Sequence, residues 1–336
     1  DGAMFGMGLH QASLFGGIDA VRDSTGWRVQ TAGRDCLGLE IASAELGGAV
    51  TLQPETLQLC PEQGRITRQT QDGLSGRVNL GDIAVPLTGR AVRGTLVLQD
   101  AHVDWTAGRA LDLAFTAETL GLPGEIGERT LDIAAAAPRL NLSFGRQTRM
   151  SATLDETVLD GDMVPANVMI ETLQFDGRLA RGRFAATGTA QQVHITDPDP
   201  DPRYRPLVAN LDAVFDGANL TMSGPISLQR PDIKIGDSTL EMDLLSLDGT
   251  ARVTSIDLVF APLGLQPKTL SDRVRVLFSY GRGAVKARAD FTIRKGVVTG
   301  TGDVSIADFG FDSQRLGSAD GINGALHFDD IIALTT

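Results

Sequence analysis

The chain has 336 residues, of which 42% are hydrophobic, 21% charged and only 5% aromatic, and its formal net charge is −12. This is the composition of a folded globular protein. The acidity argues against nucleic-acid binding and against broad electrostatic adhesion to an anionic membrane surface. No run of about 18 apolar residues is present, so the sequence predicts no transmembrane helix within these residues.

The two cysteines, Cys36 and Cys60, each border a short apolar run. Since no histidine lies nearby in the sequence, a structural zinc site is not expected. We predict a disulfide between neighbouring strands, formed in an oxidising compartment and worth about 3 kcal/mol of stability. Two buried free thiols are the alternative interpretation.

Short runs with alternating apolar residues follow one another along most of the chain. Side chains of a strand point to opposite faces with period two, so each run predicts a strand with one apolar and one polar face. The apolar positions in chain order include Leu96/Leu98, Leu111/Leu113/Phe115, Leu140/Leu142/Phe144, Leu173/Phe175, Phe184/Ala186, Leu211/Ala213/Phe215, Leu240/Met242/Leu244, Ile256/Leu258/Phe260 and Val304/Ile306. Asp-Gly pairs between several of these runs are typical of hairpin turns. We therefore predict an all-β chain, a long antiparallel meander of about twenty strands.

The clearest interruption is the segment 197–206, in which proline and aspartate alternate. Proline donates no backbone hydrogen bond, so we expect a loop that divides residues 1–196 from residues 207–336 of one elongated sheet. Its alternating aspartates resemble a calcium loop, but the glycine and glutamate that such a loop needs are missing. We predict no metal site there.

Residues 269–279 have a pattern that fits two kinds of structure. Leu270 and Val274 have the spacing of a helix face, and Ser271 or Thr269 offers a cap. Val274, Val276 and Phe278 equally fit a strand. We favour a short helix, and we expect at most one or two short helices in the whole chain.

Residues 284–294 carry the most regular alternation. Five apolar side chains, Val285, Ala287, Ala289, Phe291 and Ile293, fall on one face of the predicted strand, and charged or polar ones fall on the other. No nucleophile elbow, phosphate-binding loop or dinucleotide-binding motif accompanies these strands. The four histidines are scattered singly, with His194 and His327 expected on the solvent side. We therefore predict neither an enzyme nor a cofactor.

The apolar positions admit two architectures. A closed core of two packed sheets or a barrel is one. The other is a sheet curled into an open trough, favoured by the many small aliphatic and few aromatic side chains, which could hold acyl chains by apolar burial. We expect the following residues to line such a groove: Leu111, Leu113, Phe115, Leu140, Leu142, Phe144, Val285, Phe291, Ile293, Val304 and Ile306.

The C-terminal third resembles the YdbH family of AsmA-like bacterial envelope proteins, relatives of TamB and YhdP. The resemblance covers about 80 residues well, and the N-terminal two thirds match only in their glycine-punctuated alternation and cysteine pair. The residues that carry it are Ile256–Phe260, Leu265-Gln-Pro-Lys-Thr-Leu270, Gly281–Ile293, Gly302–Ile306 and Gly321-Ile-Asn-Gly-Ala-Leu-His-Phe-Asp-Asp-Ile-Ile-Ala-Leu-Thr335.

The resemblance implies a periplasmic protein, anchored to the inner membrane by a segment outside these residues, whose curled sheet carries glycerophospholipids toward the outer membrane. It also implies a small outer-membrane lipoprotein that meets the C-terminal edge by strand addition. A structural or assembly scaffold that engages client strands at sheet edges is the alternative function. We expect these 336 residues to be a piece of a longer protein.

Overall fold

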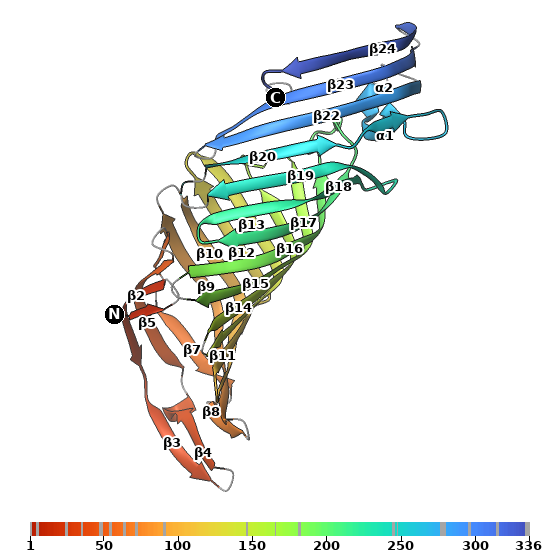
Figure 1. Ribbon diagram of the computed structural model, residues 1–336. Coiled ribbons are helices and arrows are strands. Elements are labelled where there is room, and N and C mark those ends of the chain that lie inside the picture. The colour runs from red at the N-terminus through yellow and green to blue at the C-terminus, as the bar shows by residue number, and fades with distance from the viewer. Residues whose placement is uncertain are drawn as a thin grey trace. The chain divides into compact units, whose positions relative to one another are not determined.

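The computed structural model confirms an all-β chain built on a large antiparallel sheet with only short helices (Figure 1). It describes residues 2–4, 7–23, 26–34, 36–46, 50–53, 56–62, 65–70, 73–89, 92–145, 147–164, 166–180, 183–243, 246, 248–275, 280–294, 297–313 and 316–332. The chain forms two compact units. Unit 1 holds residues 1–161 and 172–188, and unit 2 holds residues 162–171 and 189–336. The Pro/Asp-rich loop at 197–206 lies inside unit 2.

Unit 1 contains fourteen described strands and one 3-10 turn, η1 (Ala32–Arg34). The strands are β1 (Gly2–Met4), β2 (Met7–Phe15), β3 (Ile18–Asp23), β4 (Gly26–Thr31), β5 (Leu37–Leu46), β6 (Val50–Leu52), β7 (Leu57–Pro61), β8 (Arg65–Thr70), β9 (Gly73–Gly89), β10 (Val92–Ala107), β11 (Leu111–Thr116), β12 (Thr119–Ile126), β13 (Arg129–Phe144) and β14 (Thr148–Asp160). The boundary between the units runs through β15 (Asn167–Ala180) and β16 (Arg183–Thr196).

Unit 2 contains the remaining strands and both described α-helices. The strands are β17 (Leu207–Asp216), β18 (Asn219–Leu228), β19 (Ile233–Asp243), β20 (Asp248–Ser255), β21 (Leu258–Phe260), β22 (Tyr280–Arg294), β23 (Val297–Ser313) and β24 (Gly317–Phe328). The helices, α1 (Pro267–Leu270) and α2 (Asp272–Arg275), have four residues each. The predicted helix at 269–279 is therefore two single turns, and its residues 276–279 lie outside the described part. No helix in the described part combines the length and apolar character of a membrane span.

Strand pairing follows the predicted meander in unit 2 and departs from it in unit 1. In unit 2, β17, β18, β19, β20, β22, β23 and β24 pair in that order, and β21 extends the line of β20 along β22. In unit 1, β9 also pairs with β6, β7 and β8, while β2 pairs with β5 and β4 with β8. The segment before β9 thus folds back on itself, which period-two alternation alone does not specify.

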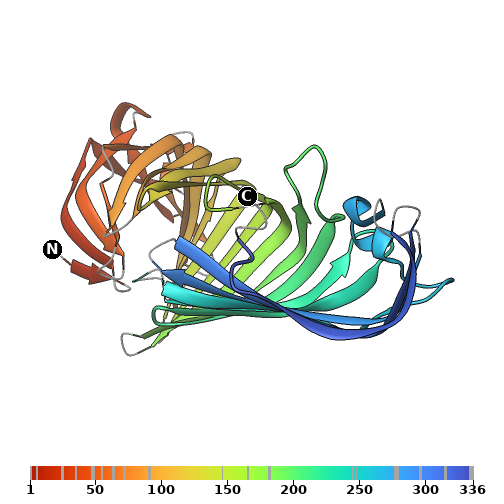
Figure 2. The same ribbon diagram turned by 90° about the horizontal axis from the view of Figure 1, so that it is seen from above.

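Several strands of each unit are interrupted at a residue with a positive φ, and we call these positions the crease. The non-glycine residues among them are Gln11, Asp100, Ala137 and Glu156 in unit 1, and Gln192 and Asp308 in unit 2. Register shifts mark β-bulges at Asp100, Ala137, Glu156 and Asp308. Neighbouring strands support these bulges: the backbone N–H groups of Asp100, Gln192 and Asp308 donate to side-chain oxygens of Asp82, Asn210 and Asn323, at 2.9 to 3.0 Å. Bulges bend a strand and increase its twist, and the strands of each unit are visibly curved (Figure 2).

The crease also explains how one face stays apolar along a whole strand. Each bulge adds one residue and so reverses the faces to which later residues point. In β10, Leu96 and Leu98 precede the bulge at even positions, whereas Ala101, Val103 and Trp105 follow it at odd positions, and all five are buried or half-buried. The other strands that bulge at a positive-φ residue in mid-sheet show the same reversal. One face, which we call the apolar face, is therefore continuous across the crease in each unit.

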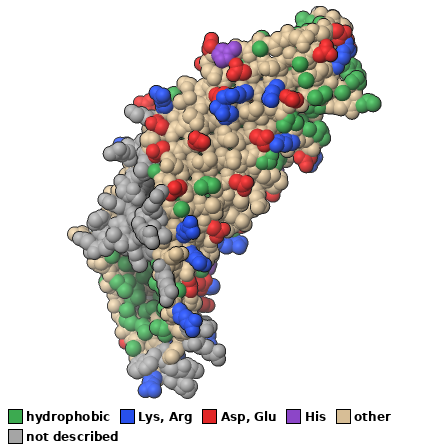
Figure 3. All heavy atoms as spheres, viewed as in Figure 1, with side chains coloured by type: hydrophobic (Ala, Val, Ile, Leu, Met, Phe, Trp, Pro, Cys, Tyr) green, Lys and Arg blue, Asp and Glu red, His purple; other side chains and the backbone are tan. Residues whose placement is uncertain are grey.

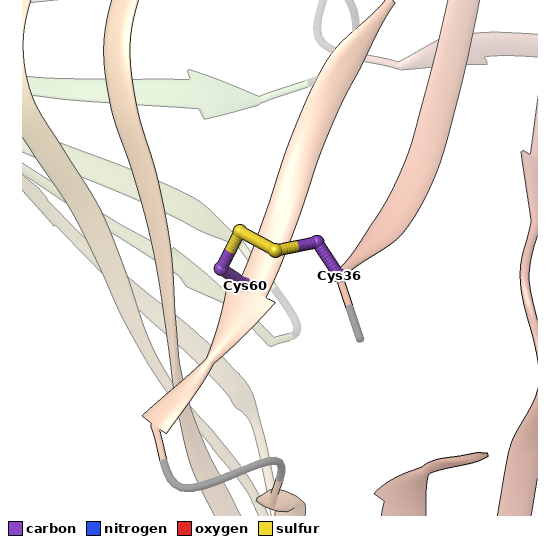
Figure 4. The surroundings of a disulfide bond; sticks show 2 residues. All are labelled: Cys36 and Cys60. Atoms are coloured by element: carbon purple, nitrogen blue, oxygen red, sulfur yellow. A yellow bond between two sulfur atoms is a disulfide. The ribbon is translucent and has the colours of Figure 1, made fainter. Parts of the chain in front are cut away.

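The N-terminal part of unit 1 is tied by the disulfide between Cys36 and Cys60 (Figure 4). Cys36 directly precedes β5 and Cys60 lies in β7, and these two strands pair from Leu37 to Leu59. The predicted link therefore joins neighbouring strands. Because it closes a loop across a sequence separation of 24 residues, it restricts the unfolded chain more than the folded one.

Candidate functional site

The six groove residues predicted in the N-terminal part lie together on the apolar face of unit 1. The register pairs Leu111 with Phe144, Leu113 with Leu142, and Phe115 with Leu140, on the adjacent strands β11 and β13. Residues directly opposite in an antiparallel pair point to the same face. All six side chains thus share one patch, and each is half-buried.

This patch extends to strands that the sequence prediction left out. On one side Val103 and Trp105 of β10 lie opposite Phe115 and Leu113. On the other side Met150 of β14 lies opposite Leu142. Toward β9 the patch joins a cluster of buried side chains that consists of Ile83, Val85, Leu98, Ala101 and Ala117.

The five groove residues predicted in the C-terminal part lie together on the apolar face of unit 2. Val285 pairs with Ile306, and Val304 pairs with Ala287 two residues further along β22. Phe291 and Ile293 continue the same phase of β22 and lie opposite Gly300 and Val298. These five predicted side chains are half-buried as well.

Half-burial distinguishes the two architectures that the sequence left open. Inward side chains at the centre of a closed sandwich are packed on all sides and lose nearly all their solvent contact. None of the eleven predicted residues reaches that state. Some apolar-face side chains are more open still, such as Val253, which is 37% exposed and lies opposite Ala289 on β22. One layer of sheet with a solvent-reachable apolar face accounts for these exposures.

One end of the apolar face in unit 2 is covered by the helices. Leu258, Phe260 and Phe309 are buried there. Leu265, two residues before α1, and Leu270, the last residue of α1, pack against them. The rings of Phe260 and Phe309 meet edge to face with centroids 6.1 Å apart. Since the helices lie against the inside of the curved strands in Figure 2, the apolar face of unit 2 is its concave face.

The buried amide of Gln266 attaches this helical cover to the sheet. Its Nε2 donates to the carbonyls of Ala261 and Gly281, at 2.5 and 3.0 Å, and the Gly281 N–H donates to its Oε1 at 2.9 Å. The side chain thereby pairs with β22 as a strand backbone would. A glutamine with 5% exposure is stable only because these bonds are made.

The loop at 197–206 packs on the same helices through charged groups. The carboxylate of Asp197, with no exposed surface, accepts hydrogen bonds from the Nε and backbone N of Arg203, both at 2.7 Å. The Arg203 guanidinium, with further backbone donors, lowers the pKa of Asp197 well below its usual range. Arg273 of α2 contacts Asp199 at 3.0 Å and Asp201 at 3.3 Å. The three aspartates of this loop therefore pair with arginines.

The opposite, convex face carries the charges (Figure 3). Asp290 of β22 accepts from Arg288 and from Arg252 of β20, both at 2.6 Å, and these guanidinium groups lower its pKa. His194 lies on the polar phase of β16, 3.0 Å from Glu171, and His327 lies 2.7 Å from Asp303. The described residues contain no cluster of three or more potential metal ligands.

A hollow of about 1020 Å³ opens at the ends of β18, β19, β20 and β22. Its apolar lining includes Leu220, Met242 and the predicted groove residue Ile293. Its polar lining includes Asp243 and Arg294. Apolar side chains beside charged groups at a strand end suit an amphipathic ligand, with the apolar part on the sheet and the polar part toward water.

Comparison with known proteins identifies no relative. No protein-family model, no curated protein and no solved structure matches the chain. The function is therefore argued from the geometry, and the resemblance in the C-terminal third stays a prediction.

Proposed function

We propose that the chain is a segment of a periplasmic conduit that carries glycerophospholipids between the inner and outer membranes. The observation that carries this proposal is the half-burial of the apolar face in each unit, at cross-strand-paired Leu, Val, Ile and Phe positions. Covering such a surface with acyl chains is favourable, by about 25 cal/mol for each Å² of apolar surface that is removed from water. Headgroups would stay in water at the strand ends.

Three further features support the proposal. The crease keeps the apolar face continuous along each strand, so that a chain lying across it meets few polar side chains. The Cys36–Cys60 disulfide suits an oxidising compartment such as the periplasm. The resemblance in the C-terminal third adds an inner-membrane anchor beyond these residues and a small outer-membrane lipoprotein that pairs with the C-terminal edge.

A scaffold that engages client strands is the second candidate, and the edge strand β24 favours it. Among the described pairings β24 bonds only to β23, and ten of its twelve residues, all except Ala319 and Phe328, are exposed, on both faces of the strand. An unpaired edge is a template for another strand. A scaffold has no need of a solvent-reachable apolar face, however, and the conduit accounts for both features.

Site-specific photocrosslinking tests the conduit. A benzophenone amino acid placed at Phe291, on the concave face, should crosslink to phospholipid in cells. The same group at Thr292, the exposed next residue on the opposite face of β22, is the matched control and should give little lipid product. Equal lipid crosslinking at both positions, or none at Phe291 in a folded protein, would contradict the proposal.

A further inference from the structure

The apolar face of unit 2 contains a notch without side chains of its own. Gly300 and Gly302 lie on the apolar phase of β23, between Val298 and Val304. Phe291 lies opposite Gly300, and Phe328 of β24 lies opposite Gly302. A Cβ atom on Gly300 would stand 2.8 Å from the Phe291 ring, and one on Gly302 would stand 3.7 Å from the Phe328 ring. The two glycines thus form the floor of a narrow depression that these two aromatic rings border.

A segment of the chain itself occupies this notch. After β24 the chain turns back, and the Ile331 N–H donates to the Gly300 carbonyl at 2.9 Å. A Cβ atom on Gly302 would stand 2.8 Å from Cγ2 of Ile331, and one on Gly300 would stand 3.0 Å from its Cγ1. The Ile331 side chain therefore lies directly on both glycines, and both are buried beneath it although neighbouring valines are only half-buried.

We infer that this notch is a binding site for one acyl chain of a phospholipid, and that Ile331 occupies it when no lipid is bound. The inference rests on the proposed conduit function and deepens it. A branched aliphatic side chain seated between aromatic rings on a glycine floor shows the chemistry that the notch accepts: saturated carbon, without a polar partner. A flexible methylene chain satisfies the same contacts.

The attachment of Ile331 lacks the full burial of a core side chain. Its N–H donates to the sheet, and the side chains of Ile331 and Ile332 are both half-buried. The neighbouring Asp330 carboxylate accepts from the Ile332 N–H at 2.9 Å. A lipid that gains more apolar burial than these two isoleucines can displace the segment.

Two substitutions with opposite expected effects test the site. Ile331→Asp makes the self-inserted side chain unsuitable for an apolar notch, so it should raise the affinity for a fluorescent acyl probe at least about threefold. Gly302→Val fills the notch, so it should lower the affinity by a similar factor or more. Val214→Asp, on the polar face of β17 where the side chain is 52% exposed, is the control and should change nothing.

The probe is a phospholipid with one pyrene-labelled acyl chain, titrated into the whole chain, and the matching free pyrene fatty acid forms a second arm. Circular dichroism shows that each variant keeps its sheet, and Ile331→Ala repeats the test without a new charge. Unchanged or weaker phospholipid binding by both Ile331 variants overturns the inference, and so does a gain confined to the free fatty acid. If neither the wild type nor any variant binds either probe, the proposed conduit function is wrong. If the wild type binds the phospholipid probe and the notch variants bind it with the same affinity, the conduit function stands and only the assignment of the notch is wrong.

Discussion

Adding one carboxylate to the apolar face should release lipid, while the same addition one residue away on the other face should not. Leu142 lies at the centre of the unit 1 patch, between Leu113 of β11 and Met150 of β14. Asn141 precedes it on the same strand and points to the polar face, where its Nδ2 donates to Ser151 at 3.3 Å. Leu142→Asp and Asn141→Asp therefore add equal charge at adjacent positions on opposite faces.

The magnitude follows from the spacing of the strands. An acyl chain that passes over Leu113, Leu142 and Met150 crosses two strand intervals, about 9.6 Å. If a carboxylate at the central position removes apolar contact from about three methylene groups, the loss is about 2.4 kcal/mol, or roughly a fiftyfold weaker interaction. Asn141→Asp leaves these contacts intact, so its bound lipid should stay within about twofold of wild type.

The assay is extraction and mass-spectrometric quantification of phospholipid per mole of purified protein, with circular dichroism to verify the fold. Because Leu142 is half-buried rather than buried, the aspartate keeps access to water and the variant should fold. Equal lipid content in the two variants would refute the assignment of the apolar face as the lipid surface. A loss in Asn141→Asp alone would place the lipid on the opposite face.

Three other predictions concern the parts that shape the apolar face. Cys60→Ser should lower the free energy of unfolding by about 3.5 kcal/mol in urea titrations, the chain-entropy value for a loop of the 24 residues separating it from Cys36, and a loss below about 1 kcal/mol would show that the disulfide does not constrain the unfolded chain. Gln266→Ala should cost about 2–3 kcal/mol in the same assay, since it leaves buried backbone groups of β22 without a partner; an unchanged transition would show that water replaces the amide. Asp197→Asn should lower the melting temperature at pH 7 because the charged carboxylate binds Arg203. The folded-state pKa of Asp197 is lowered, so this stabilisation is present above its unfolded value and is lost as the pH falls through the folded pKa. The difference in melting temperature between wild type and variant should therefore shrink below about pH 4, and a difference that grows there would contradict the assignment.

Period-two alternation was enough to predict the fold class and the grouping of the groove residues. It works because side chains two residues apart in a strand point to the same face of the sheet. Leu111, Leu113 and Phe115 therefore had to lie on one face, and a shift of one residue would have moved all three to the other face. The register that placed them opposite Phe144, Leu142 and Leu140 was not predictable, because it depends on pairing between strands that are separated along the chain.

The crease was missed, although the sequence carries a signal for it. In some bulged strands two consecutive polar residues interrupt the alternation, as with Gln99-Asp100 in β10 and Gln191-Gln192 in β16, and the apolar phase reverses after them. An adjacent pair of non-core residues inside an otherwise regular strand is how one extra residue is accommodated. Gln266 and Ile331 offered no comparable signal, because their roles arise from contacts that only the folded chain creates.

Native mass spectrometry of the purified wild-type chain tests the central claim most directly. If the chain is a lipid conduit, we expect mass additions that match intact two-chain glycerophospholipids, released at collision energies that leave the protein intact. A chain that is folded, as judged by circular dichroism and the intact Cys36–Cys60 disulfide, yet carries no lipid after purification from a phospholipid-rich membrane extract would contradict it.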